Sequence, residues 1–456
     1  MLRRKIYDKI LNWKNRSQGR SALLIEGARR VGKSKIVEFF AQREYRSFIV
    51  VDFAKPKDGV VDAIVRHPDD LDGLFNLLTL SYGVKLFRRE SVIVFDEVQL
   101  CPPARQLIKY LVEDGRYDYI ETGSLISLRR NVEKISIPSE EDALPMYPMD
   151  FEEFCWAMGD EITVPTAREA FARLKPLGQA AHQTILRRYR EYLAVGGMPQ
   201  AVNAYLAERD FSAADSAKRL ILKLYADDIS KYAGNDAPKV RGVFNQIPGQ
   251  LAKKEKRYFL TSVSEGARMR EYAESFRWLD ESKTVNIARN ANDPSVSLGM
   301  SEDYDTQKLY SSDTGLLVTQ AFMDSDYTEN ELYKALMLDR LSINNGMIAE
   351  NAVAPSLRAC GRELYFYSRY GRDKSDERME IDFLIRRAGK ISPIEVKSAG
   401  YQHHASLDKF MKKFSRRLGT PYILYMKDIM EKDGIVHLPL YMAPFLCEKN
   451  SAGTHP

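Results

Sequence analysis

The chain has 456 residues, of which 44% are hydrophobic and 29% are charged, so it is long and apolar enough to bury several cores. At roughly 100–200 residues per domain, we expect about three or four domains of ordinary globular composition. The formal net charge of +5 is small, which excludes nucleic-acid binding through a protein-wide positive field and leaves only local basic clusters.

The cysteines at positions 101, 155, 360 and 447 show no C-x-x-C spacing. This pattern argues against structural zinc and predicts reduced thiols, as in a cytoplasmic protein. The first residues are basic, but no apolar segment follows them, and no apolar run in the chain approaches ~20 residues. We therefore expect neither a targeting segment nor a membrane-spanning helix.

A phosphate-binding motif lies near the start of the chain. Residues 21–34 read SALLIEGARRVGKS, in which a short apolar strand precedes the pattern G-x-x-x-x-G-K-[ST], and KIVEFFAQ continues as a helix. In this order of strand, loop and helix, backbone N–H groups surround phosphates, Lys33 adds a positive charge and Ser34 ligates Mg²⁺. The predicted nucleotide-binding residues are Gly27, Ala28, Arg29, Arg30, Val31, Gly32, Lys33 and Ser34.

Two further apolar strands end in polar residues. SVIVFDEVQ ends in Asp96 and Glu97, at the place where a parallel strand meets the phosphate loop. We expect Asp96 to hold Mg²⁺ through water and Glu97 to polarise the attacking water, and the alternative is a pair of solvated carboxylates. The next strand, in YDYIETGSLISL, ends in Thr122 and Ser124, which also fit a simple turn.

The middle of the chain is predominantly helical. Between residues 180 and 232, apolar residues recur at three- and four-residue spacing, which predicts helices. Between 237 and 300, two or three short helical patterns lead into a strand at TVNIAR, an order that fits a winged helix. Arg268 and Arg270, near the start of the candidate recognition helix, favour DNA binding, and docking of a protein is an equal alternative.

The C-terminal third carries a second group of charged residues. GMIAENAVAPSLRA predicts a helix with Glu350, and ERMEIDFLIRR predicts a strand with Asp382. ISPIEVKSAG predicts the next strand, on which Glu395 and Lys397 project to one face. This order fits a PD-(D/E)XK nuclease site, in which Asp382 and Glu395 bind Mg²⁺ or Mn²⁺, Glu350 assists the metal and Lys397 stabilises the developing charge. The spacing alone is a weak signal, and a structural ion or buried salt bridges are alternatives.

The segments LLIEGARRVGKS, VIVFDEVQ, ETGSLISL, YPMDFEEF, YLAVGGMPQAV and KLYSSDTGLL occur in this order. On these segments, almost the whole chain resembles the prokaryotic AAA-type P-loop ATPases that carry a C-terminal domain of unknown function. The resemblance implies an α/β fold with a P-loop parallel-sheet ATPase domain (1–150), a helical lid region (151–235), a winged-helix-like domain (236–320) and a restriction-endonuclease-like α/β domain (331–447). It also implies that Ser124 senses the γ-phosphate, and Arg129 or Arg130 is a candidate arginine finger.

Together, these features predict a Mg²⁺-dependent ATPase whose nucleotide state controls a nuclease-like C-terminal half acting on DNA. Its cofactors would be ATP and Mg²⁺, with Mn²⁺ as an alternative at the C-terminal site. A first alternative function is a nucleotide-switched binding protein that recognises a protein or a nucleic acid without cutting it. A second alternative is a ring-forming motor, which would be a homo-oligomer.

Overall fold

The computed structural model describes residues 1–124, 139–253, 255–294, 297–323, 329–337, 345–369, 379–398 and 402–448. The chain divides into two compact units. The first consists of Met1–Tyr147 with Glu281–Lys283, and the second consists of Pro148–Asp280 and Thr284–Pro456. Among the described helices, none is long and apolar enough to cross a membrane.

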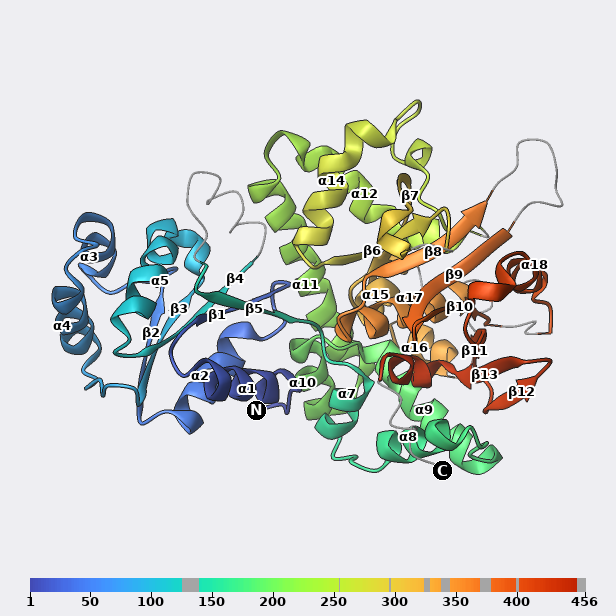
Figure 1. The fold of residues 1–456 in the computed structure, drawn as a ribbon, viewed down its shortest axis with the longest axis horizontal. Helices are drawn as coiled ribbons and strands as arrows, with labels where there is room; N and C mark the ends of the chain where they lie inside the picture. Colours follow the sequence, from blue (N-terminus) through green and yellow to red (C-terminus); the bar gives the residue numbers. More distant parts are fainter. Residues whose placement is uncertain are drawn as a thin grey trace. The chain divides into compact units, whose positions relative to one another are not determined.

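The first unit is built on a parallel sheet with the strand order β2-β3-β4-β1-β5 (Figure 1). Its strands are β1 (Ala22–Gly27), β2 (Ser47–Asp52), β3 (Ser91–Asp96), β4 (Asp118–Gly123) and β5 (Glu141–Met146). Its helices are α1 (Ile6–Ser17), α2 (Lys33–Glu44), α3 (Val60–Arg66), α4 (Leu71–Tyr82) and α5 (Pro102–Asp114), with a 3₁₀ turn η1 (Val98–Leu100). Because the strands are parallel, their C-terminal ends, including those of β1 and β3, lie along one edge of the sheet.

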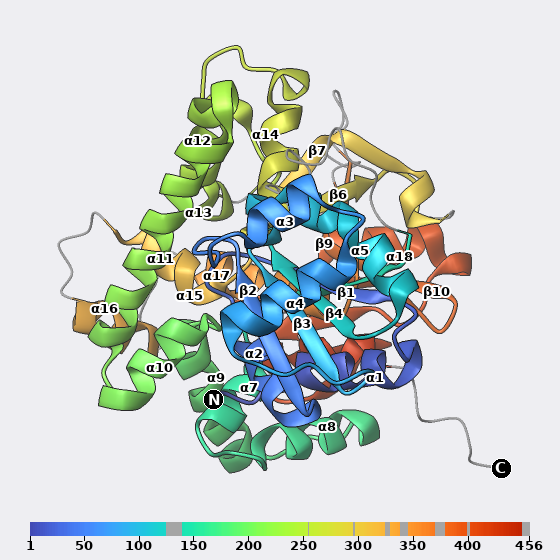
Figure 2. The same ribbon diagram turned by 90° about the vertical axis from the view of Figure 1, so that its left-hand side faces the viewer.

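Helices cover both faces of this sheet. Successive residues of a strand point to opposite faces, so each strand contributes side chains to the cores on both sides. Ala22 and Leu24 of β1 belong to a core that also contains side chains from α3, α4 and α5. These three helices lie over one face of the sheet (Figure 2). Leu23 and Ile25 of the same strand belong to a core with α1 and α2. Burial on both faces explains why the strands of this unit read as continuous apolar runs and not as alternating patterns.

The second unit begins with a series of helices. They are α7 (Phe151–Ala157), α8 (Thr163–Arg173), α9 (Gln179–Val195), α10 (Pro199–Glu208), α11 (Phe211–Tyr232), α12 (Ala237–Asn245), α13 (Ile247–Leu251) and α14 (Met269–Glu281). Local sequence explains several of their ends. Asp150 and Glu153 form a reciprocal capping box at the start of α7. Pro199 opens α10, where the N–H that proline lacks would have no partner in the helix. The helices expected between residues 180 and 232 are thus present.

A mixed sheet with the strand order β12-β13-β11-β10-β9-β8-β6-β7 forms the rest of the second unit (Figure 1). Its strands are β6 (Val285–Ala291), β7 (Glu302–Ser311), β8 (Leu364–Arg369), β9 (Met379–Arg387), β10 (Lys390–Val396), β11 (Tyr422–Tyr425), β12 (Met430–Lys432) and β13 (Ile435–Pro439). Strands β6 and β7 pair as an antiparallel hairpin, and β6 also pairs in parallel with β8. Strands from residues 236–320 and from residues 331–447 therefore share one sheet, and the predicted boundary between these two regions stays a prediction.

Helices pack against this sheet and bring a charged residue to it. They are α15 (Thr314–Ala321), α17 (Asn345–Ala359), α18 (Ala405–Phe414) and the 3₁₀ helix η7 (Leu440–Cys447). Helix α16 (Glu329–Met337) contacts α9 and α11 instead. Leu407 and Phe410 of α18 lie in one core with Ile381 of β9. Helix α17 contacts β6, β7, β8 and β10, and these contacts place the predicted site residue Glu350 against the sheet.

Candidate functional site

The phosphate-binding loop joins β1 to α2 at the C-terminal edge of the parallel sheet. Gly27 pairs with Met146 of β5, and a Cβ atom on Gly27 would lie 2.3 Å from the Met146 carbonyl oxygen, so a larger residue does not fit. Arg30 and Gly32 have left-handed backbone conformations, with φ of 69° and 102°, which curl the loop. Lys33 Nζ donates to two loop carbonyl oxygens at 3.0 and 3.1 Å. The loop thus has a defined shape with the lysine ammonium lying on it.

Asp96 is the point at which three sequence motifs meet. Its Oδ1 atom accepts hydrogen bonds from Ser34 Oγ, at 2.7 Å, and from Thr122 Oγ1. These contacts arise because β4, which carries Thr122, lies between β3 and the P-loop strand β1. A hydroxyl and a carboxylate are hard oxygen ligands of the kind that Mg²⁺ prefers, so Ser34 and Asp96 fit a magnesium ion.

Glu97 follows Asp96 in the chain and has an unusual backbone conformation. Its φ and ψ are 54° and 45°, a left-handed conformation that is uncommon for a residue other than glycine. Its N–H donates to Thr122 Oγ1 at 3.4 Å, and its Oε2 accepts a hydrogen bond from Gln99 Nε2. Such outliers concentrate at functional sites. The backbone and Gln99 together fix this carboxylate beside Asp96.

Arg4 contacts the loop from a position that the motifs did not reveal. Its side chain is buried, and Nη1 donates to the Val31 carbonyl at 3.1 Å while Nη2 donates to the Tyr147 carbonyl at 2.6 Å. This arginine therefore connects the P-loop to the segment that follows β5. Nothing in the sequence distinguishes it from the other basic residues at the start of the chain.

In the second unit, a buried lysine lies among three carboxylates. Lys308 of β7 is fully buried, and its Nζ atom lies 3.2 Å from Glu350 Oε1, 2.7 Å from Glu380 Oε1 and 3.4 Å from Asp382 Oδ1. Lys256 forms a second ion pair with Glu350. Lys308 was not among the residues predicted from the sequence, because Lys308 lies on a strand far from Asp382 in the chain.

The charges of this cluster shift the pKa values of its members in opposite directions. Burial opposes ionisation of Glu350, but the positive charges of Lys256 and Lys308 outweigh it and lower the pKa of Glu350 to about 2. Burial, followed by the negative charge of Glu350, raises the pKa of Asp382 to about 7. Burial also opposes the charged form of Lys308, but the surrounding carboxylates, led by Glu350, raise its pKa well above its usual value. Glu350 therefore favours its ionised form beside Lys308, whereas Asp382 is readily protonated.

Glu395 belongs to a different group of charges. Its Oε1 atom lies 2.6 Å from Lys397 Nζ, and the other charged groups that affect its pKa include His404 and Asp408. Burial raises the pKa of Glu395, and Lys397 opposes this rise. Asp382 pairs with Lys308, and its Oδ2 atom accepts the Val396 N–H at 2.8 Å. Lys397 therefore pairs with Glu395, whereas Asp382 pairs with Lys308.

The predicted metal ligands Glu350, Asp382 and Glu395 do not come together as a metal centre. Within the described ranges, no group of three or more His, Cys, Asp or Glu side chains is arranged to hold a metal ion. Glu350 and Asp382 come together as predicted, but around the Lys308 ammonium. The carboxylates of this cluster thus already have a positive partner, so they do not fit Mn²⁺ or Mg²⁺ as they stand.

Comparison with known families assigns three segments of the chain. Residues 19–155 match the family described as AAA domain. This segment contains the P-loop and the Ser34–Asp96 contact.

Residues 19–155 therefore resemble an AAA domain with a P-loop, and this segment is called the AAA domain.

Residues 186–327 and 345–442 match two families described as domains of unknown function, DUF8612 and DUF4143. No curated protein matches the chain.

Three of the solved structures that match the chain show a distant likeness. A Walker-type ATPase of Pyrococcus abyssi is 14% identical with a TM-score of 0.43, and the match covers 70% of this chain and 96% of that one. The Aeropyrum pernix Orc1 protein, solved in complex with DNA, is 13% identical with a TM-score of 0.27, covering 71% of this chain and 93% of the other. A Vibrio cholerae protein is 11% identical with a TM-score of 0.18, covering 88% and 96%. At TM-scores this low, these likenesses support no functional argument.

The remaining predictions concern Ser124 and two pairs of arginines. Thr122, at the end of β4, contacts Asp96 of the AAA domain, whereas the predicted sensor Ser124 follows the end of that strand. Arg268 immediately precedes α14 and Arg270 lies in its first turn, and both are exposed. The candidate arginine fingers, Arg129 and Arg130, lie outside the described residues.

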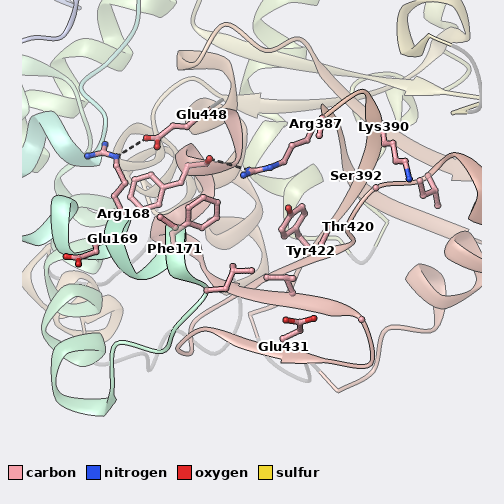
Figure 3. Close-up of a pocket in the computed structure, with 18 of the residues that line it drawn as sticks. Arg168, Glu169, Phe171, Arg387, Lys390, Ser392, Thr420, Tyr422, Glu431 and Glu448 are labelled. Carbon is pink, nitrogen blue, oxygen red and sulfur yellow. Dashed lines mark hydrogen bonds and ion pairs between the residues drawn. The ribbon is translucent and has the colours of Figure 1, made fainter. Parts of the chain in front are cut away.

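A cavity of about 1,040 Å³ in the second unit contains none of the predicted site residues (Figure 3). Phe171 and Phe445 contact each other in its wall, with ring centroids 5.5 Å apart. Arg168, on the same wall, pairs with Glu448 at 2.9 Å, and Arg387 donates to the Phe445 carbonyl at 3.4 Å. Its lining carries acidic and basic side chains in similar measure, so the cavity does not favour a ligand of either charge.

Proposed function

We propose that the AAA domain binds ATP and hydrolyses it with the help of Mg²⁺. The observation that carries this proposal is the convergence of Ser34, Asp96 and Thr122, which joins the phosphate loop to the carboxylate-bearing end of β3. Nucleotide hydrolysis needs this arrangement, because catalysis consists mainly of positioning the phosphates and neutralising charge. The match of residues 19–155 to the AAA family supports the same activity.

Each residue of the site has a distinct role in this proposal. The loop N–H groups and Lys33 bind the phosphates, and Ser34 and Asp96 hold the magnesium ion. Magnesium, when bound, neutralises negative charge on the phosphates. Glu97, held by Gln99 and by its own backbone conformation, accepts a proton from the attacking water or orients it. Thr122 fixes Asp96 and is a positioning residue.

Two variants and a control test this assignment. Lys33→Ala should abolish ATP binding, measured by fluorescence anisotropy of a labelled ATP analogue, because the loop loses the Lys33 ammonium group that binds the phosphates. Glu97→Gln should bind the analogue normally but lose about 10²-fold or more in turnover, because the general base is removed. Lys35→Ala serves as the matched control, since Lys35 is exposed on the same helix and pairs with neighbouring Glu38. Full turnover by Glu97→Gln would contradict the role given to this residue.

For the second unit, we infer recognition of DNA without cleavage, under control of the nucleotide. The order of α12, α13 and α14 followed by the β6–β7 hairpin is compatible with the winged helix expected from the sequence, and Arg268 and Arg270 are exposed at the start of α14. Recognition of a protein partner is the competing proposal. Assembly into a homo-oligomer also remains a proposal, since the candidate arginine fingers Arg129 and Arg130 lie outside the described residues.

The Lys308 cluster favours recognition over cleavage. A cutting site of the PD-(D/E)XK type brings its carboxylates to a metal ion, whereas here Asp382 and Glu350 contact an ammonium group and Glu395 pairs with Lys397. Cleavage of DNA, with Asp382, Glu395 and Lys397 as the catalytic residues, stays a prediction that depends on the residue pattern alone.

A binding assay and a cleavage assay separate these proposals. The double variant Arg268→Ala, Arg270→Ala should weaken binding of a labelled duplex at 0.1 M salt, with the salt dependence reduced as phosphate contacts are lost. Plasmid incubated with the protein and Mg²⁺ or Mn²⁺, with and without ATP, should remain intact. If the protein nicks the plasmid and Asp382→Asn abolishes the nicking, the second unit cleaves DNA and the proposal of recognition without cleavage is wrong. If the double variant binds the duplex as well as the unmodified protein does, Arg268 and Arg270 do not contact DNA.

A further inference from the structure

Two of the cysteines come together in the second unit, although they are far apart in the sequence. All four cysteines are free thiols, of which Cys101 and Cys155 are buried, Cys360 is exposed and Cys447 is partly exposed. Cys360 follows the last residue of α17, and Cys447 is the last residue of η7. The packing of α17 against η7 therefore brings the ends of these two helices to the same place.

Cys360 contacts both helices at the junction of α17 and η7. Its Sγ atom lies 3.2 Å from the Ser356 carbonyl oxygen in α17 and 3.8 Å from the Pro444 carbonyl oxygen in η7. Its side chain also forms a hydrogen bond with Cys447. The two sulfur atoms are thus neighbours across the junction of α17 and η7, with the exposed Cys360 on its outer side.

The surroundings of Cys447 favour its thiolate. The hydrogen bond with Cys360 contributes most to lowering the pKa of Cys447, and the positive charges of Arg362 and Arg387 lower it further. Burial opposes this shift at Cys447, and it is the largest cause of the raised pKa values of Cys101 and Cys155. Glu448, the nearest acidic residue in the sequence, forms an ion pair with Arg168. Because the thiolate is the reactive form of cysteine, Cys447 is the nucleophile of this pair.

From these contacts, we propose that Cys360 and Cys447 form a redox-sensitive dithiol that hydrogen peroxide converts into a disulfide. In the first step, the Cys447 thiolate attacks one peroxide oxygen, the O–O bond breaks, and a proton from water completes the products, a sulfenic acid and water. In the second step, the Cys360 sulfur attacks the sulfenic sulfur, the S–O bond breaks, and the Cys360 proton leaves with the hydroxyl as a second water. The two sulfur atoms lose two electrons, and the peroxide gains them.

The proposed disulfide would tie the C-terminal end of α17 to the end of η7. Helix α17 carries Glu350, one of the carboxylates around Lys308, so the bond would hold one side of that cluster in place. The inference is independent of the function proposed above, because no step of nucleotide or DNA chemistry enters it.

Oxidation of the full-length protein tests the proposal. The reduced protein is treated with one to ten equivalents of hydrogen peroxide, quenched with iodoacetamide, and mapped by peptide mass spectrometry without reduction. We expect loss of two of the four thiols and an intramolecular peptide pair that joins Cys360 to Cys447. Cys447→Ser should leave Cys360 as a free thiol, whereas Cys360→Ser should leave a sulfenic acid on Cys447 that dimedone traps.

Alkylation rates give a second readout that needs no variant. Each unit by which a thiol pKa falls raises the thiolate fraction at neutral pH by about tenfold, so Cys447 should react with iodoacetamide faster than Cys101 and Cys155. Three outcomes would overturn the proposal: independent oxidation of Cys360 and Cys447 without a cross-link, a cross-link only between two copies of the chain, or alkylation of Cys447 no faster than that of the buried cysteines.

Discussion

Replacement of Lys308 by methionine tests the Lys308 cluster directly. Methionine keeps much of the side-chain length but removes the ammonium group that contacts Glu350 at 3.2 Å, Glu380 at 2.7 Å and Asp382 at 3.4 Å. Coulomb's law with an effective dielectric constant of about 20 gives roughly 5 kcal/mol for unit charges at such separations. Removing one partner of a buried ion pair costs about 3–5 kcal/mol, because the other charge is left uncompensated. We expect Lys308→Met to lose that much stability.

The chain has two compact units, so a single unfolding transition is not the best measurement. Native-state hydrogen exchange read by mass spectrometry resolves individual strands. Since about 1.4 kcal/mol corresponds to a tenfold change, amides of β7 and β9 should exchange roughly 10²- to 10⁴-fold faster in Lys308→Met. Amides of β1 in the AAA domain should not change and serve as the internal reference.

Two further variants make this prediction refutable. Lys390→Met removes an exposed lysine from the same sheet and should change stability by less than about 0.5 kcal/mol. Adding Glu380→Gln to Lys308→Met removes the carboxylate that lies 2.7 Å from Lys308 Nζ and should recover part of the loss, since contacting residues are energetically coupled. Exchange of β7 and β9 in Lys308→Met within about tenfold of the unmodified protein would refute the reasoning, because the ammonium would then not hold the cluster together.

Three shorter predictions concern other positions. Thr122→Val should lower ATP turnover by about tenfold or more with little effect on nucleotide affinity, because Asp96 loses a hydrogen bond that orients it; a steady-state comparison of kcat and KM checks this. Gly27→Ala should abolish nucleotide binding and lower the melting temperature, because its Cβ would lie 2.3 Å from a backbone oxygen of β5; an unchanged melting curve would contradict the close approach. Asp382 has a pKa of about 7 in the folded protein, so it binds protons more tightly there than in the unfolded chain. Its contribution to the free energy of unfolding therefore falls as the pH rises from about 4 to 7, by about 4 kcal/mol at most. Asp382→Asn should flatten this part of the stability profile, measured by denaturant unfolding at several pH values.

The N-terminal site was predictable from the sequence because its determinants are local. Gly27 and Ser34 belong to one loop, and a strand must precede it and a helix must follow it, so the motif and its structure reinforce each other. Asp96 follows from the same logic, since parallel strands bring their C-terminal ends to one edge. The choice between Thr122 and Ser124 was beyond the sequence, because it depends on which hydroxyl reaches Asp96 from β4.

The second unit was less predictable because its contacts are non-local. The helix with Glu350 and the strands with Asp382 and Glu395 are present where the patterns placed them. Which charges meet, however, depends on the strand order, and β7 carries Lys308 to the cluster through pairings with strands far away in the chain. The junction of Cys360 with Cys447 is of the same kind, since only the packing of α17 on η7 creates it.

The shared sheet of the second unit has a practical consequence for dissecting this protein. Strand β8 pairs with β6 on one side and with β9 on the other, so the hairpin and the C-terminal strands complete each other's hydrogen bonding. A fragment that stops near residue 320 would keep the hairpin but leave the edge of β6 without its partner. A fragment that starts near residue 331 would likewise leave β8 unpaired on one side, and it would lack Lys308. Unpaired strand edges recruit other strands, so both fragments should aggregate, whereas a cut that keeps residues 148–448 together preserves the complete sheet.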